Sequence, residues 1–228
     1  MSLEEPGLSE RKRFRFVRLL IRWHKENRRL FPWRTNQHPY RVLIAEILLQ
    51  RTPANRVSTF FPHFVDRFPG PQSIMSTSVH ELEQFLKPMG LKKRAYWLVK
   101  LMKEICEKHN CKIPDKEDEL THLPGVGRYT ARAVLSFGFK KDVAIVDMNV
   151  VRVLSRVFGL SERKRQPHAD TEIWTLASLL VPKGEGPEYN EALLDFAALI
   201  CRKTPLCHIC LINGICEYYI ALQKRLNM

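Results

Sequence analysis

Residues 123–160 read LPGVGRYTARAVLSFGFKKDVAIVDMNVVRVLSRVFGL, and this stretch predicts both the fold and the chemistry. It opens with a turn that contains Gly125 and Gly127, and glycine permits positive φ and close approach of a ligand to the backbone. An acidic helical stretch, residues 115–122, precedes the turn, and a helix-forming run, residues 128–137, follows it. The pattern therefore predicts two helices joined by a glycine-rich hairpin. The first N–H groups of the second helix can bind one anion, for which a DNA phosphate is the natural candidate.

A lone carboxylate lies about ten residues beyond this motif. Residues 143–146 form a short apolar run that delivers Asp147 to the start of a helix predicted over residues 149–158. Aspartate is a favoured helix N-cap, so a structural role alone would explain it. A helix N-terminus also stabilises a carboxylate anion, so the structural and the catalytic interpretations are compatible.

These two segments resemble the helix-hairpin-helix superfamily of base-excision DNA glycosylases, in its endonuclease III-like, iron–sulfur branch. LPGVGRYTA resembles the family hairpin, VDMNVVRVLSR resembles the segment that carries the catalytic aspartate, and the resemblance continues over nearly the whole chain. It implies an all-α fold with two helical subdomains and a C-terminal four-Cys metal loop. The expected subdomains are residues 31–138, and residues 8–30 together with 139–228.

The resemblance assigns the hairpin to DNA and the carboxylate to the reaction. Gly125, Gly127 and Arg128 are expected to bind DNA. Asp147 is expected to lie beneath C1′ of an extruded nucleotide, where it would stabilise an oxocarbenium-like sugar and orient or deprotonate water.

Composition agrees with a polyanionic partner. The 228 residues carry a formal net charge of +13, and no apolar run reaches membrane-spanning length. The charged N-terminus lacks the apolar region of a signal peptide. These features favour a nucleic-acid partner and a location in the cytoplasm with the nucleoid or in a nucleus. The resemblance to the glycosylases further implies a monomer whose partner is double-stranded DNA containing a mismatched or damaged base. Residues 1–7 are expected to be disordered and residues 161–166 to form a charged loop.

Glu46 lies in the middle of a predicted helix, residues 41–51, that is apolar around most of its circumference. An ionised carboxylate is expensive to bury unless it is paired, and burial would raise its pKa into a range useful for proton transfer to a base. Pairing with Arg41 or Lys92 would explain it equally well. IAEILLQRT resembles the stretch whose glutamate lines the flipped-base pocket in adenine and thymine-mismatch glycosylases, which favours the catalytic interpretation.

Three further residues are predicted to bind DNA, again from the resemblance. Gln50 takes the position that fills the gap left by the extruded base, and Arg51 could contact the widowed base or a phosphate. Leu91, in a segment that resembles the family's GLxxxRA pattern, takes the position of an apolar wedge that unstacks a base step. A core leucine following a helix cap is the alternative for Leu91.

Tyr129 predicts the reaction type. Bifunctional relatives carry a lysine at this position, whose amine forms a Schiff base and leads to strand cleavage. A phenol cannot form an imine, so the tyrosine predicts hydrolysis of the glycosidic bond alone. Lys140 and Lys141 lie nearby in sequence and could substitute, although basic loop residues more often contact phosphate.

The C-terminal segment contains four clustered cysteines, with intervals of five, two and five residues. Four thiolates at such spacing indicate a metal, for which zinc is the simplest choice, and the resemblance favours a [4Fe–4S] cluster. The predicted ligands are Cys201, Cys207, Cys210 and Cys216. Cys106 and Cys111 lack this spacing and are expected to be ordinary thiols, while Arg152 and Arg156 are expected to form ion pairs or to contact phosphates.

The sequence therefore predicts a monofunctional DNA glycosylase that removes thymine or uracil opposite guanine. An adenine glycosylase acting on A:G or A:8-oxoguanine pairs is the closest alternative, because it would share FPWR at residues 31–34, Glu46 and Asp147. A bifunctional glycosylase with lyase activity and a non-catalytic DNA-binding module remain as further alternatives.

Overall fold

The computed structural model describes residues 9–160 and 171–226 as helices and connecting turns, without any β-strand in these residues. The all-α prediction is therefore confirmed. The predictions made for residues 1–7 and 161–166 lie outside the described residues. No helix in the described ranges is both long and apolar enough to span a membrane.

The chain divides into two compact units, which we name by their functional segments. The hairpin unit is Leu30–Lys140. The cysteine unit combines Met1–Arg29 with Lys141–Met228.

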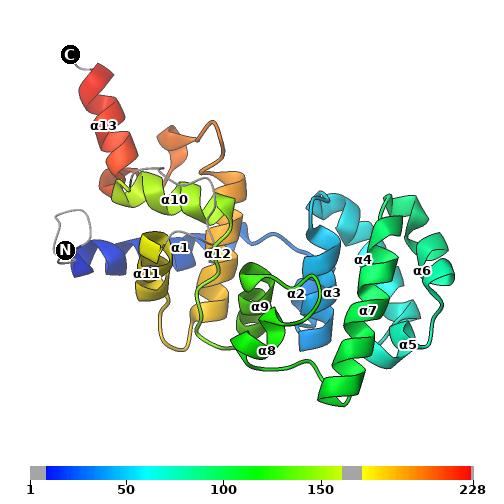
Figure 1. Ribbon diagram of the computed structural model, residues 1–228. Coiled ribbons are helices and arrows are strands. Elements are labelled where there is room, and N and C mark those ends of the chain that lie inside the picture. Colours follow the sequence, from blue (N-terminus) through cyan, green and yellow to red (C-terminus); the bar gives the residue numbers. More distant parts are fainter. Residues whose placement is uncertain (1–8, 161–170, 227–228) are drawn as a thin grey trace. The chain divides into compact units, whose positions relative to one another are not determined.

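The hairpin unit contains nine helices or helical turns after the short α2 (Pro32–Thr35). Helix α3 (Pro39–Leu49) is central, with Leu43, Ile44 and Leu48 fully buried, and it packs against α4, α9 and η3. Helix α7 packs against α5 and α6 (Figure 1). The other elements are α4 (Ala54–Arg67), α5 (Pro71–Met75), α6 (Val79–Leu86), η2 (Lys87–Met89), α7 (Lys92–His109), α8 (Glu117–Thr121), α9 (Arg128–Ala133) and η3 (Val134–Gly138).

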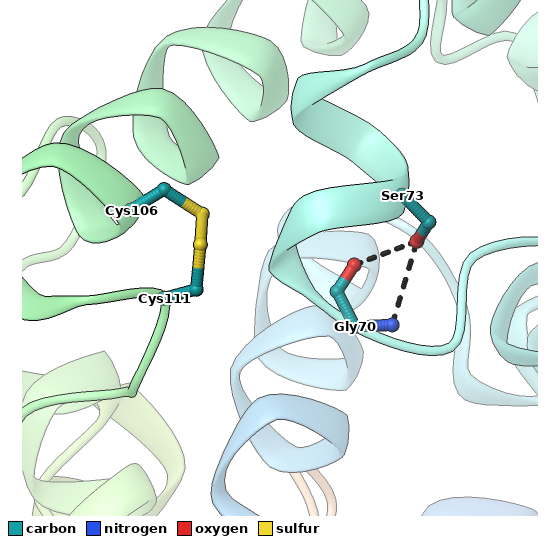
Figure 2. The surroundings of a disulfide bond; sticks show 4 residues. All are labelled: Gly70, Ser73, Cys106 and Cys111. Carbon is teal, nitrogen blue, oxygen red and sulfur yellow. Dashed lines mark hydrogen bonds between the residues drawn. A yellow bond between two sulfur atoms is a disulfide. The ribbon is translucent and has the colours of Figure 1, made fainter.

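Local sequence sets several of these boundaries. Pro39 starts α3, where a missing N–H is harmless. Gly70 precedes α5, and Ser73 Oγ donates a hydrogen bond to the Gly70 carbonyl at 2.6 Å and accepts one from the Gly70 N–H at 3.4 Å (Figure 2). Helix α7 ends at Asn110, which adopts φ +51°, a conformation that asparagine tolerates better than most residues.

A disulfide bond joins Cys106 to Cys111 at the end of α7 (Figure 2). The expectation that both are ordinary thiols is therefore wrong. Cys106 lies on the last turns of the helix, and the chain reverses through Asn110 and Cys111, which both have positive φ, so the two sulfur atoms meet.

The predicted helix over residues 128–137 also differs from the structure. It begins at Arg128 as expected but widens at η3 into a π-helical turn, in which the Phe139 N–H donates to the Val134 carbonyl five residues earlier, at 3.1 Å. Such single π-turns often lie near functional sites.

The cysteine unit is built around α12 (Gly186–Leu199), against which α1 (Glu10–Asn27) and α10 (Met148–Phe158) pack. Phe16, Leu20, Leu154 and Phe196 lie in its apolar core. Its remaining elements are α11 (Thr171–Leu180), η5 (Cys207–Ile209), η6 (Asn213–Ile215) and α13 (Glu217–Leu226).

Candidate active site

Asp147 is half-buried and caps the N-terminus of α10. Its Oδ1 accepts hydrogen bonds from the N–H groups of Asn149 at 2.9 Å and Val150 at 2.8 Å. Its Oδ2 accepts one from the Asn149 side-chain amide at 2.7 Å. The buried residues Ala144, Ile145 and Val146 anchor the segment before it. The carboxylate is thus fixed in orientation at the positive end of a helix.

A chain of hydrogen bonds connects this carboxylate to the first of the clustered cysteines. Asn149, which donates to Asp147, accepts from Arg152 Nη1 at 2.9 Å. Arg152 in turn donates from Nε to the Cys201 carbonyl at 2.9 Å and from Nη2 to the Ala197 carbonyl at 3.1 Å.

Arg156, one turn further along α10, binds the same region. It donates to the carbonyls of Arg202 at 2.6 Å and Lys203 at 3.0 Å, and its Nη1 lies 3.7 Å from Cys201 Sγ. Both arginines thus bind main-chain carbonyls in the described residues: Arg152 binds those of Ala197 and Cys201, and Arg156 binds those of Arg202 and Lys203. A contact of either arginine with a DNA phosphate stays a prediction.

The four clustered cysteines line one pocket, together with apolar side chains such as Phe196, Ile200 and Ile212. Burial raises the pKa of Cys210 to about 11, and burial together with neighbouring thiols raises the pKa values of Cys207 and Cys216. Within residues 9–160 and 171–226, no three or more His, Cys, Asp or Glu side chains are arranged to hold a metal ion as they stand. The pocket thus gathers the thiols without forming a finished ligand set.

The hairpin unit contains the other predicted site residues. Glu46 is half-buried on α3, and Tyr129 is half-buried on the first turn of α9. Helices α3 and α9 pack against each other. Asp147 and the four cysteines belong to the cysteine unit.

The hairpin itself has the predicted form. Gly125 has φ +76°, and a Cβ atom at Gly125 or Gly127 would meet no atom within 4 Å, so both backbones face open space. The side chains of Leu123 and Val126 are buried and anchor the turn to the core of the unit. Arg128 is exposed, and its Nε lies 3.3 Å from Glu117 of α8, which is a partner that DNA would have to compete with.

Gln50 is exposed at the end of α3 and contacts the hairpin. Its Nε2 donates to the Gly125 carbonyl at 3.4 Å. Arg51 follows with φ +55°, which for a residue other than glycine stores about 1–2 kcal/mol of backbone strain. Within the described part of the chain, Arg51 makes no hydrogen bond or ion pair, so it is available to a ligand.

The side chain of Leu91 does not protrude, as a wedge into the duplex would. It is only 8% exposed and precedes α7 as its N-cap, after Gly90 with φ +71°. This placement favours the alternative of a core leucine following a helix cap.

One site residue was missed by the sequence analysis. Arg94 belongs to the GLxxxRA segment, yet its role depends on main-chain carbonyls of another helix, which no motif reveals. Its side chain reaches the end of α3, and it lines a pocket of about 280 Å³ with Gln50, Trp97 and Gly125.

Both the sequence and the fold of the chain are similar to those of known proteins. Residues 44–178 match the HhH-GPD superfamily of base excision DNA repair proteins. The chain is 38% identical over 217 residues to a thymine/uracil-DNA glycosylase of Pyrobaculum aerophilum, covering 92% of this chain and 93% of that one. It is 31% identical to an adenine DNA glycosylase of Buchnera aphidicola, covering 90% of this chain and 58% of that one. A solved structure of a thermostable thymine-DNA glycosylase superposes with a TM-score of 0.88 at 34% identity, covering 92% and 98% of the two chains.

Proposed function

The chain belongs to the HhH-GPD superfamily of base excision DNA repair proteins, and on that basis we propose that it is a monofunctional DNA glycosylase that removes thymine or uracil opposite guanine. The single observation that carries the proposal is the carboxylate of Asp147, held by two backbone N–H groups at the start of α10. A carboxylate fixed in this way suits the stabilisation of positive charge at C1′.

The proposed reaction begins with extrusion of the target nucleotide, because C1′ is not accessible inside the duplex. A mismatched pair is easier to open, which contributes to selectivity. Glu46 would contact the extruded base and Tyr129 would border the sugar. Asp147 would stabilise the developing oxocarbenium ion and orient or deprotonate the attacking water.

DNA binding would use the hairpin and the adjacent turn. Gly125, Gly127 and Arg128 would receive a phosphate, Gln50 would enter the gap left by the base, and Arg51 would contact the opposite strand. Open space at both glycines and the exposed Arg51 side chain support these roles. Leu91 would contact the duplex only if its buried side chain moved outward.

The absence of strand cleavage follows from Tyr129. Its phenol cannot form the Schiff base that a lysine forms at this position. Lys140 is the nearest amine in sequence, and its Nζ donates to the side-chain oxygen of Gln37.

The choice of thymine or uracil over adenine is supported by the relatives. Identity is 38%, 35% and 36% to three proteins named as thymine or thymine/uracil glycosylases, and 31%, 32% and 33% to proteins named as adenine DNA glycosylases. Adenine removal is the second candidate, since half-buried Glu46 suits protonation of a purine equally well.

Incubation with duplexes that contain T:G, U:G, A:G, A:8-oxoguanine or an oxidised pyrimidine tests the proposal. Each reaction is divided into portions with and without alkali. Alkali-dependent cleavage at T:G and U:G is expected. Alkali-independent cleavage would indicate a lyase, and no abasic product on any duplex would indicate a DNA-binding module.

The proposed cofactor is a [4Fe–4S] cluster, with zinc as the alternative. Four thiols that line one apolar pocket fit either metal, and a cation there would offset the burial and mutual repulsion that raise the thiol pKa values. Bound metal would cross-link residues 201–216, a segment too short to form its own core, and would take no part in the hydrolysis. Visible absorbance of the purified protein distinguishes iron–sulfur from zinc.

A further inference from the structure

Two turns of the hairpin unit carry Gln50, Arg51 and Leu91, three of the residues expected at the DNA. The glutamine turn, residues 49–53, joins α3 to α4 and contains Gln50. The leucine turn, residues 87–91, joins α6 to α7 and contains Leu91. The third residue of the helix after each turn is an arginine. The guanidinium of this arginine binds main-chain carbonyls of the other turn, or of the helix that precedes the other turn.

Arg94, after the leucine turn, binds the end of α3. Its Nη1 donates to the carbonyls of Ile47 at 3.0 Å and Leu48 at 2.9 Å. Its Nη2 donates to the carbonyl of Gln50 itself. The Arg94 side chain is half-buried, and this burial lowers the pKa of its guanidinium.

These carbonyls are the unsatisfied acceptors at the C-terminus of a helix, so a cation satisfies them and complements the helix dipole. The same contact holds the backbone immediately before Arg51, where φ is +55°. Arg94 therefore stabilises the strained turn that presents Gln50.

Arg56, after the glutamine turn, makes the reciprocal contact. Its Nη2 donates to the Pro88 carbonyl in the leucine turn at 3.1 Å. The Gln50 side chain adds a third connection, from the glutamine turn to the hairpin at Gly125.

We propose that Arg94 and Arg56 are positioning residues that hold the glutamine and leucine turns at a fixed separation. Gln50 is then already aligned with the gap in the duplex when the base leaves. This inference rests on the proposed glycosylase function and adds the means by which the duplex-facing turns are pre-organised. Arginine suits the task because its rigid fork of donors binds several acceptors at once, which a lysine ammonium on a flexible stem does less well.

The test compares single-turnover excision from two duplexes. One contains uracil opposite guanine, and the other contains uracil opposite a synthetic abasic site. In the second duplex, extrusion breaks no base pair, so an inserted side chain contributes less. A variant with a displaced glutamine turn should be impaired mainly on the first duplex, whereas a variant that is partly unfolded should be impaired equally on both.

Arg94→Met is expected to slow excision from the U:G duplex by on the order of 100-fold. Excision from the abasic-site duplex should slow by less than about 10-fold. Arg94→Lys should recover part of the U:G rate. Arg56→Met should act in the same direction with a smaller effect, because it removes one bond. Arg67→Met is the matched control, since this exposed α4 arginine pairs with Glu81 at 2.6 Å and touches neither turn; it should behave as wild type.

Equal losses on both duplexes, or Arg94 and Arg56 variants indistinguishable from Arg67→Met, would overturn the inference. If Arg94→Met does not fold, the exposed Arg56 still provides the same comparison. The wild-type protein separates the two proposals. If it excises uracil from neither duplex, the proposed glycosylase function is wrong, and this inference is wrong with it. If the wild-type protein is active but the variants lose activity equally on both duplexes, only this inference is wrong.

Discussion

Arg152 donates a hydrogen bond from Nε to the carbonyl oxygen of Cys201 at 2.9 Å, and this contact joins α10 to the first residue of the cysteine loop. The same guanidinium also binds the Ala197 carbonyl and the Asn149 amide oxygen. One side chain thus supports both the segment that orients Asp147 and the loop that carries the thiols.

Replacing Arg152 by methionine should destabilise the cysteine unit. Three acceptors would lose a charged donor, which corresponds to a loss of about 2–4 kcal/mol in the free energy of unfolding. Urea unfolding measures the loss, and limited proteolysis should show earlier cleavage within residues 201–216. Arg18→Met is the control, because Arg18 is exposed and lies 3.5 Å from Glu185, so it should lose less than about 1 kcal/mol. Similar losses in the two variants would contradict this assignment.

Asp147 serves as both a helix cap and the proposed catalytic carboxylate, and two variants separate these roles. Asp147→Ser keeps an N-cap oxygen without the charge, and Asp147→Asn keeps the shape. Both should fold and bind DNA, with single-turnover excision slowed by roughly 10²- to 10⁴-fold. Mobility-shift and excision assays measure the two properties, and unchanged excision rates would remove Asp147 from the mechanism.

Tyr129 predicts the outcome of borohydride trapping. The wild-type protein should give no covalent adduct with a U:G duplex, because no amine at this position can form an imine. Tyr129→Lys should restore a trappable amine and serves as the positive control on the same gel. A trapped wild-type adduct would refute the monofunctional assignment and direct attention to Lys140 or Lys141.

Tyr40 provides a prediction of pH dependence. Its hydroxyl donates to the Phe68 carbonyl at 2.7 Å, and burial raises its pKa well above the ordinary value of 10.0, with the Arg41 cation opposing the shift. The folded state therefore favours the neutral phenol, so its contribution to stability is complete below pH 10.0 and is lost as pH rises above that value. Tyr40→Phe should lose about 1 kcal/mol at neutral pH, and the difference from wild type should shrink at alkaline pH.

Tyr189 is the matched control for this effect at neutral pH. It is as deeply buried as Tyr40, but its hydroxyl has no hydrogen-bond partner in the described residues. Tyr189→Phe should therefore be neutral or stabilising. Equal destabilisation by the two substitutions would show that the Phe68 contact contributes nothing.

The disulfide between Cys106 and Cys111 should affect stability without affecting catalysis. It closes a short loop, so the chain-entropy model predicts a gain of about 2 kcal/mol at most. The double variant with serine at both positions should melt earlier than the oxidised protein and excise uracil at the wild-type rate. Reduced wild-type protein should melt like the variant, and a slower excision rate in either would contradict a purely structural role.

The sequence predicted the parts of this protein that depend on local pattern. The all-α class was implied by the resemblance to the glycosylase family, and the capping role of Asp147 follows from its position after an apolar run. The glycine hairpin was recognisable because Gly125 adopts a conformation that other residues rarely tolerate.

The parts that the sequence could not supply depend on contacts between distant segments. Arg94, Arg152 and Arg156 bind main-chain carbonyls, and every residue carries such an acceptor, so no residue type marks the partner. Leu91 was assigned a protruding role by family position, whereas its burial depends on how η2 and α7 pack around it.

Gly138, at the end of η3, constrains the helix that carries Glu46. A Cβ atom there would lie 2.8 Å from the Cα of Pro39, the first residue of α3. Even an alanine would have to push the start of α3 aside, and a rigid helix transmits such a displacement along its length. The position is therefore intolerant of a side chain, and Gly138→Ala should lower the free energy of unfolding and displace the helix that carries Glu46.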